Sequence, residues 1–201
     1  MSISRHRTTA LVASLFAAGC SGDDISPTVD AAPLGSGPGA TVKCESSGKN
    51  AFDTYGANAF VAVNKKIFAN VTTEITGHST TNLGDSFAKV GSGTPASTAD
   101  DAAKFEGKLA AFLVYAYGGP NDITYADGVS YHGPQDMVAA HVGLAITSAQ
   151  YDYFISSIVV PALISSGVMH GTGGATSPDD VTTCFAPIVT DAAFKASIVG
   201  K

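Results

Sequence analysis

Charged side chains are scarce in this chain, and basic ones are the scarcer kind. Only 14% of the 201 residues are charged, and 11 Lys and Arg against 17 Asp and Glu give a formal net charge of −6 at pH 7. Nucleic-acid binding needs a clustered basic face, so we expect no nucleic-acid partner. Hydrophobic residues make up 45% of the chain, which is typical of a globular core and argues against a disordered chain.

Tryptophan and the common catalytic motifs are absent as well. The sequence holds no GxSxG, HExxH or CxxC motif and no phosphate-binding loop, and each of these would have indicated a particular chemistry. Most Phe and Tyr residues lie between positions 52 and 154. We therefore expect the core in the middle of the chain.

The first residues have the pattern of an export signal. A basic start is followed by an apolar run at residues 10–18, which is too short to span a bilayer, and then by Cys20 after small residues. This ending resembles the lipobox of bacterial lipoproteins, although Ala17 stands where that family usually has Leu. The resemblance implies that residues 1–19 are cleaved and that Cys20 is lipidated. The protein would then be anchored through its lipid in the cell envelope, in the periplasm or at the outer membrane; ordinary secretion is the alternative.

Residues 20–43 are rich in Gly, Pro, Ser and Asp. Such a segment buries too little apolar surface to offset its chain entropy, so we expect a flexible tether. The folded domain is expected to span residues 44–201. If Cys20 carries lipid, Cys44 and Cys184 remain, and in an oxidising compartment they can form a disulfide worth up to about 4–5 kcal/mol. Two buried free thiols are the alternative.

The hydrophobic pattern repeats every three to four residues and never alternates for long, so the predicted class is all-α. Residues 50–71 form a helix or helix pair broken near Gly56. The polar stretch 72–98 is expected to be a loop. A second helix should start near Thr98 and stop at the Gly-Gly-Pro sequence that begins with Gly118.

The second half of the chain predicts three further helices. After a loop at residues 121–133, Pro134 should open a short helix. Thr147 is a suitable cap for the next helix, and Ser177 for the last one. Two of these helices contain a proline that should kink them: Pro161 and Pro187.

His141 is the histidine that falls in a predicted helix, on the same face as Met137 and Leu144. A hydrogen-bonded core histidine is the ordinary interpretation. No second His, Cys or carboxylate lies at chelate spacing, so a zinc site has no support. A single imidazole beside an apolar cavity fits haem iron, because the porphyrin supplies four bonds and the protein one axial nitrogen. The other ring nitrogen would bond the carbonyl of Met137.

Two segments carry a family resemblance. FEGKLAAFLVYAYGGP, residues 105–120, resembles the long distal helix and Gly-Gly turn of group 1 truncated haemoglobins. QDMVAAHVGLAITSAQYDYFI, residues 135–155, is similar to their proximal helix and the start of the next helix. Residues 52–71 are similar to the opening helices, and DDVTTCFAPIV near the C-terminal end also fits. The resemblance implies a globin-like, truncated two-over-two helical fold that holds haem b.

The same resemblance implies residue roles. His141 falls on the proximal iron ligand. Lys108 falls on a lysine that pairs with a haem propionate, with a solvated surface charge as the alternative. Phe68, Phe105 and Leu109 fall on distal positions where members of the family place Tyr or Gln. The expected haem contacts are Phe68, Phe105, Lys108, Leu109, Phe112, Met137, His141 and Leu144.

An apolar distal wall predicts weak O₂ retention, because bound O₂ carries partial negative charge that a polar donor would stabilise. CO or NO is favoured by comparison. Two stretches, residues 71–98 and 121–133, are long for this family and are called the first and second insert. Polar side chains from them could still reach the pocket. Thr72, Asn82 or Ser86 could come from the first insert, and Tyr125, Tyr131 or His132 from the second; a surface position is the simpler expectation for His132.

Three functions follow from these observations. The first is reversible binding of a diatomic gas (O₂, NO or CO) at a His-ligated haem iron. The second is NO dioxygenation or peroxide turnover at the same haem, with an electron donor that the sequence does not identify. The third is an interaction module that keeps the globin fold without haem.

Overall fold

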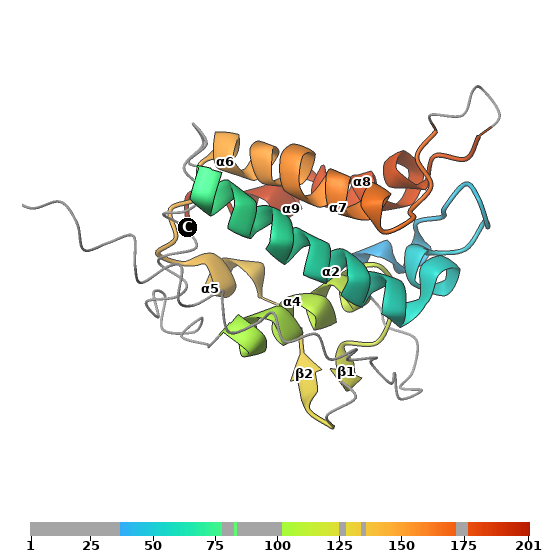
Figure 1. The fold of residues 1–201 in the computed structure, drawn as a ribbon, viewed down its shortest axis with the longest axis horizontal. Helices are drawn as coiled ribbons and strands as arrows, with labels where there is room; N and C mark the ends of the chain where they lie inside the picture. Colours follow the sequence, from blue (N-terminus) through green and yellow to red (C-terminus); the bar gives the residue numbers. More distant parts are fainter. Residues whose placement is uncertain (1–36, 78–82, 84–101, 125–127, 134–135, 172–176) are drawn as a thin grey trace, which may run out of the picture.

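The computed structural model is mostly helical (Figure 1). Several predicted features lie outside the described residues: the signal peptide, Cys20, most of the tether, Asn82, Ser86, Thr98, Tyr125 and Pro134. Within the described part, no helix has the length and apolar character needed to cross a membrane. The structure describes residues 37–77, 83, 102–124, 128–133, 136–171 and 177–201.

The long helix α2 spans Ala51–Gly77 and is broken at Gly56, whose φ of 74° is left-handed, as the sequence predicted. The prediction that residues 72–98 are a loop was wrong for residues 72–77, which continue the helix. The hydroxyls of Thr72 and Thr73 donate to backbone carbonyls one turn back, at 2.9 and 3.1 Å. These bonds satisfy the two hydroxyl groups within the helix, so the helix continues through these polar residues.

Helix α4, Ala102–Ala116, packs on α2 and ends before Gly118, whose φ is 99°. The fully buried positions are small, namely Ala110, Ala111 and Val114, because small side chains let the two helices approach closely. The large apolar side chains on α4 are only partly buried: Phe105, Leu109, Phe112 and Leu113.

The predicted loop at residues 121–133 contains a short antiparallel hairpin, which corrects the sequence prediction. Strand β1, Asp122–Thr124, pairs with β2, Ser130–His132, and Asp122 lies opposite His132. The hairpin packs against α4, with the ring of Tyr131 against Gly107, where a Cβ atom would lie 2.3 Å from the ring. In Figure 1 the hairpin projects below α4.

Helix α5, Met137–His141, is capped by Asp136, whose carboxylate accepts from the backbone N–H of Ala139. Helix α6, Ser148–Tyr153, starts at the predicted cap Thr147, which forms a reciprocal capping box with Gln150. It continues into a π-helical segment, η3, Phe154–Val159, and then α7, Val160–Ser165.

Two prolines follow π-helical segments. Pro161 lies just after η3, and Pro187 lies in α8, Ala186–Val189, just after η4, Val181–Phe185. Proline lacks an N–H and its ring crowds the carbonyl one turn back, so the helix widens where the sequence predicted a kink. The expected cap Ser177 was wrong: the Asp179 carboxylate accepts from the Thr182 backbone N–H at 3.0 Å. A further helix, α9, Ala192–Ala196, had no counterpart in the sequence prediction.

The predicted tether is shorter than residues 20–43. Pro38–Thr41 form a short 3-10 helix, η1, against the end of α4. A Cβ at Gly37 would lie 1.8 Å from the Tyr115 carbonyl oxygen, and one at Gly39 would lie 2.6 Å from that of Ala116. Both glycines permit this close backbone approach, so the packed domain includes residue 37 onward.

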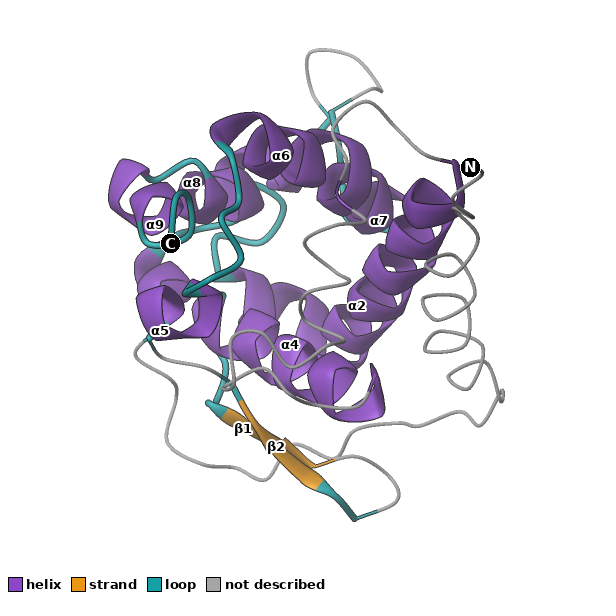
Figure 2. Cartoon of the chain, turned by 90° about the vertical axis from the view of Figure 1, so that its left-hand side faces the viewer, coloured by secondary structure: helices purple, strands orange, loops and turns teal. Residues whose placement is uncertain are grey.

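The N-terminal part of the domain is also joined covalently to the last helices. Cys44 and Cys184 form a disulfide, with Cα atoms 4.7 Å apart, which is the pairing expected from the sequence. Beside it, the rings of Phe60, Tyr117 and Phe185 pack together in the core. Viewed from the end in Figure 2, α2, α4, α5, α6 and α7 surround the middle of the domain.

Candidate functional site

His141 is the last residue of α5. Its side chain is partly buried, and its Nδ1 lies 2.7 Å from the carbonyl oxygen of Met137. A carbonyl can only accept, so Nδ1 carries the proton, and Nε2 is left with its lone pair. Among the described residues no hydrogen-bond partner occupies Nε2. Burial lowers the pKa of His141 below its ordinary value of 6.5, and the bond to Met137 opposes this shift only in part. The imidazole is therefore neutral at pH 7.

The two aromatic residues predicted for the distal wall meet. The ring of Phe68 on α2 lies edge-on to that of Phe105 on α4, with centroids 5.4 Å apart. Both side chains are only partly buried. This pair presents hydrocarbon where a Tyr or Gln would present a hydrogen-bond donor.

The remaining predicted contacts occupy α4, α5 and the turn that follows α5. Lys108, Leu109 and Phe112 are partly buried along α4, and Phe112 stacks on Phe194 of α9 at 6.2 Å. Met137 is partly buried, and Leu144 is buried at 5% exposure. The contacts described here join Phe68 to Phe105 and Met137 to His141; they do not join Lys108 or Leu109 to the histidine.

The described residues of the second insert include Tyr131 and His132, whereas Tyr125 lies outside the described part. His132 is largely exposed, and its Nδ1 contacts the carboxylate of Asp122 at 2.5 Å, while the Asn121 amide contacts the same ring. The surface position expected for His132 is therefore the one observed. Tyr131 packs on α4, and the Thr72 hydroxyl bonds its own helix.

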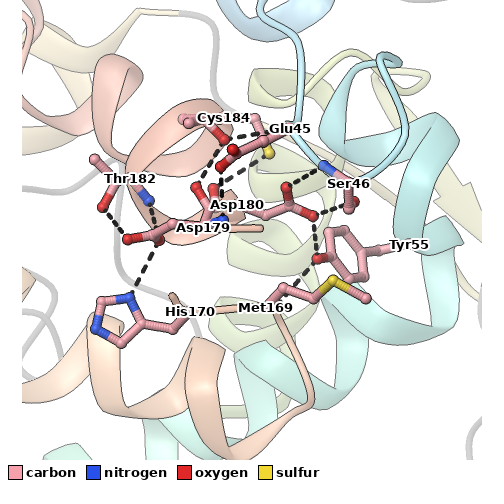
Figure 3. A network of polar contacts seen from close by, with 10 residues as sticks. Glu45, Ser46, Tyr55, Met169, His170, Asp179, Asp180, Thr182 and Cys184 are labelled. Atoms are coloured by element: carbon pink, nitrogen blue, oxygen red, sulfur yellow. Dashed lines mark hydrogen bonds and ion pairs between the residues drawn. The ribbon is translucent and has the colours of Figure 1, made fainter. Parts of the chain in front are cut away.

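A second polar cluster surrounds the disulfide (Figure 3). Asp180 is fully buried, at 0% exposure. Its carboxylate accepts from the backbone N–H of Ser46 at 2.9 Å, from the Ser46 hydroxyl, and from the Tyr55 hydroxyl at 2.5 Å. Burial, together with its bond to Asp180, raises the pKa of Tyr55 to about 12. The cluster ties the start of the domain and α2 to the start of η4.

This cluster is not a metal site as it stands. The ligand atoms of Cys44, Asp180 and Cys184 lie within 4.8 Å of one another. Metal binding by cysteine requires a thiolate, and both sulfurs are bonded to each other. The arrangement is structural, and we call it the clasp. The disulfide lies next to the Asp180 carboxylate, which accepts hydrogen bonds from the uncharged groups of Ser46 and Tyr55.

Sequence analysis missed Asp180, Tyr55 and Ser46 as partners, and missed Phe194. The only local signal for Asp180 was its position one turn before Cys184. Phe194 lies in a short helix for which Asp191 provides a cap, accepting from the Phe194 backbone N–H at 2.8 Å. That Asp-x-x-Phe spacing was the available signal.

Comparisons with known proteins add no family: neither a protein-family model, nor a curated protein, nor a solved structure matches this chain.

Proposed function

We propose that this protein is a haem-binding protein with a globin-like, two-over-two fold that reversibly binds a diatomic gas at an iron held by His141. The observation that carries the proposal is the state of His141. It is a neutral, partly buried imidazole whose Nδ1 is bonded to Met137 at 2.7 Å, which leaves Nε2 as the nitrogen available to a metal. Metal-binding histidines usually have their second nitrogen bonded in this way.

The donor set favours haem over a bare metal ion. Among the described residues, the one cluster of three or more His, Cys, Asp or Glu side chains is the clasp around the disulfide, so His141 has no such group of ligands around it. A single protein nitrogen is insufficient for zinc but sufficient for haem iron, since the porphyrin supplies the other in-plane bonds.

The apolar side chains on α2 and α4 fit a flat hydrophobic cofactor. Phe68, Phe105 and Leu109 are partly buried and are not part of the main core cluster, whereas Phe112 packs against it. The first three therefore offer apolar surface to a cofactor. When bound, the haem would supply the iron that takes the gas. The chain would hold it through His141 and exclude water with the aromatic pair, and Lys108 is the candidate partner for a propionate.

The ligand preference follows from the aromatic pair. Neither Phe68 nor Phe105 can donate a hydrogen bond to bound O₂, so O₂ gains no stabilisation from them. CO and NO depend less on such a donor. We propose that the protein retains CO or NO better than O₂, as a binder, sensor or scavenger. NO dioxygenation or peroxide turnover at the same haem, with an unidentified electron donor, is the enzymatic alternative.

We further propose that the protein acts outside the cytoplasm, anchored through lipid on Cys20. The disulfide between Cys44 and Cys184 supports an oxidising compartment.

The test is a haem titration of the full-length chain purified in mild detergent. We expect saturation at one haem per chain, with a Soret band that shifts when the reduced protein takes up CO. A folded protein that binds no haem would contradict the proposal and leave the haem-free interaction module.

A further inference from the structure

Helix α5 is only partly buried. Met137 and His141 are half-buried, Val138 is exposed, and no residue of the helix is fully buried. The turn that follows contains two residues with left-handed backbone, Gly143 with φ 85° and Ala145 with φ 53°. Alanine adopts this conformation only when its surroundings impose it, because its Cβ crowds the backbone there. Contacts beyond α5 therefore fix the turn, and the buried side chain of Leu144 is one of them.

The last residues of the chain supply that support. The backbone N–H of Ala145 donates to the carbonyl of Lys201 at 2.9 Å, and the N–H of Gly200 donates to the carbonyl of Ile146 at 2.9 Å. This pair of bonds is a small bridge between two backbone segments. In Figures 1 and 2 the C-terminal end lies beside α5 in both views.

The same segment is anchored at its other end. The ring of Phe194 stacks on Phe112 of α4, with centroids 6.2 Å apart and planes 9° from parallel. The ammonium group of Lys195 pairs with Asp152 of α6 and lies 5.4 Å from the centre of the Tyr151 ring. Residues 191–201 thus run from α4 and α6 to the turn after His141.

We propose that residues 191–201, called the strap below, are a positioning element for His141. The strap holds the turn at Ala145 and Ile146, and through it the end of α5. Because Phe194 stacks on Phe112, the strap also links the ligand helix to α4. Insofar as it concerns iron coordination, this inference rests on the proposed haem function.

Gly200 permits a matched pair of variants. Its φ is 72°, and a Cβ there would meet nothing within 4 Å. Gly200→Asn keeps the N–H and tolerates the left-handed conformation, whereas Gly200→Pro removes the N–H and excludes that φ. The two variants therefore differ in the bond to Ile146 and in the backbone conformation allowed at residue 200, not in side-chain space. A chain that ends at Gly200 is a second probe, since it removes the Lys201 carbonyl that accepts from Ala145.

The first readout needs no haem. In the full-length chain, amide hydrogen exchange should become about tenfold faster at Val142, Leu144 and Ala145 in Gly200→Pro and in the shortened chain, with Gly200→Asn like wild type. Exchange at core amides such as that of Val63 should not change. Equal exchange rates in all variants, or faster exchange throughout the core, would overturn the proposal that the strap holds the turn.

The second readout uses the haem-loaded protein. Gly200→Pro should lose haem to a haem-free acceptor globin about tenfold faster than Gly200→Asn, and the iron–histidine stretching band of its reduced form should broaden or shift. Unchanged haem loss and an unchanged band would overturn the link to His141. If no variant, wild type included, binds haem, the proposed function fails, and the exchange measurement still decides whether the strap holds the turn.

Discussion

Nδ1 of His141 lies 2.7 Å from the carbonyl oxygen of Met137, one turn earlier in α5. The contact assigns the ring tautomer, because the carbonyl can only accept. It also fixes the ring against its own helix and leaves Nε2 with a lone pair. The pKa of this residue is lowered by burial, so the lone pair is not lost to a proton at neutral pH.

The aromatic pair should control the O₂ dissociation rate of the haem-loaded protein. Phe68→Tyr or Phe105→Gln places a donor where the two rings meet at 5.4 Å. A hydrogen bond to the partly charged oxygen is worth about 1.5–3 kcal/mol, so O₂ release should slow by about one to two orders of magnitude. Stopped-flow replacement of O₂ by CO measures this rate. Leu109→Met, which adds no donor, is the control. An unchanged O₂ dissociation rate in both donor variants would contradict the role of the aromatic pair.

Removing the disulfide should lower stability. Replacing Cys44 and Cys184 together by alanine should reduce the free energy of unfolding by about 3–5 kcal/mol, because the crosslink no longer restricts the unfolded chain. Urea unfolding followed by circular dichroism measures the change. Wild type treated with a dithiol reductant should match the double variant, which itself should not respond to the reductant. A double variant as stable as the oxidised wild type would contradict this account.

Tyr55 should contribute stability that depends on pH. Its pKa is raised in the folded chain to about 12 from 10.0, so the folded state favours the neutral phenol. That contribution is fully present below pH 10 and is lost as the pH rises towards 12. Tyr55→Phe should cost about 1–3 kcal/mol at pH 7, because buried Asp180 loses a donor, and its stability difference from wild type should shrink between pH 10 and 12.

Ser46→Ala is the matched control for that measurement. It removes another donor from the same carboxylate but leaves the phenol. It should lower stability at pH 7 and keep the wild-type decline between pH 10 and 12. If the free energy of unfolding of Tyr55→Phe falls between pH 10 and 12 as steeply as that of Ser46→Ala, the phenol is not the titrating group.

Lipidation should depend on Cys20. Expressed in a bacterial host, the wild-type chain should be found in the membrane fraction with an acylated N-terminal cysteine. Cys20→Ser removes the thiol that carries the lipid and should leave the protein unanchored. Fractionation and mass spectrometry of the N-terminal peptide measure both. An unmodified Cys20 in a soluble mature protein would instead support ordinary secretion.

Local sequence signals predicted several helix boundaries. Thr147 caps α6 with Gln150 completing the box, Gly118 ends α4, and Gly56 breaks α2. These signals act within a few residues, so they survive without knowledge of the tertiary fold. The bond from His141 to Met137 was predicted for the same reason, since both atoms lie within one turn of a helix.

Long-range contacts explain what sequence analysis could not predict. The buried carboxylate of Asp180 accepts hydrogen bonds from Ser46 and Tyr55, which are 134 and 125 positions away along the chain. Helix α9 spans only Ala192–Ala196 and is stabilised by Phe194 on Phe112 rather than by helix propensity. The burial of Gly37 and Gly39 depends on the end of α4, so composition alone assigned those residues to the tether.

The most direct test of the central claim is the absorption spectrum of the full-length protein and of His141→Ala, each reconstituted with haem, in ferric, reduced and CO-bound forms. We expect an intense Soret band in wild type that shifts with CO. We expect this band to be lost or altered in His141→Ala and restored when free imidazole is added. A His141→Ala protein whose spectra match wild type without imidazole would show that another residue, or none, binds the iron.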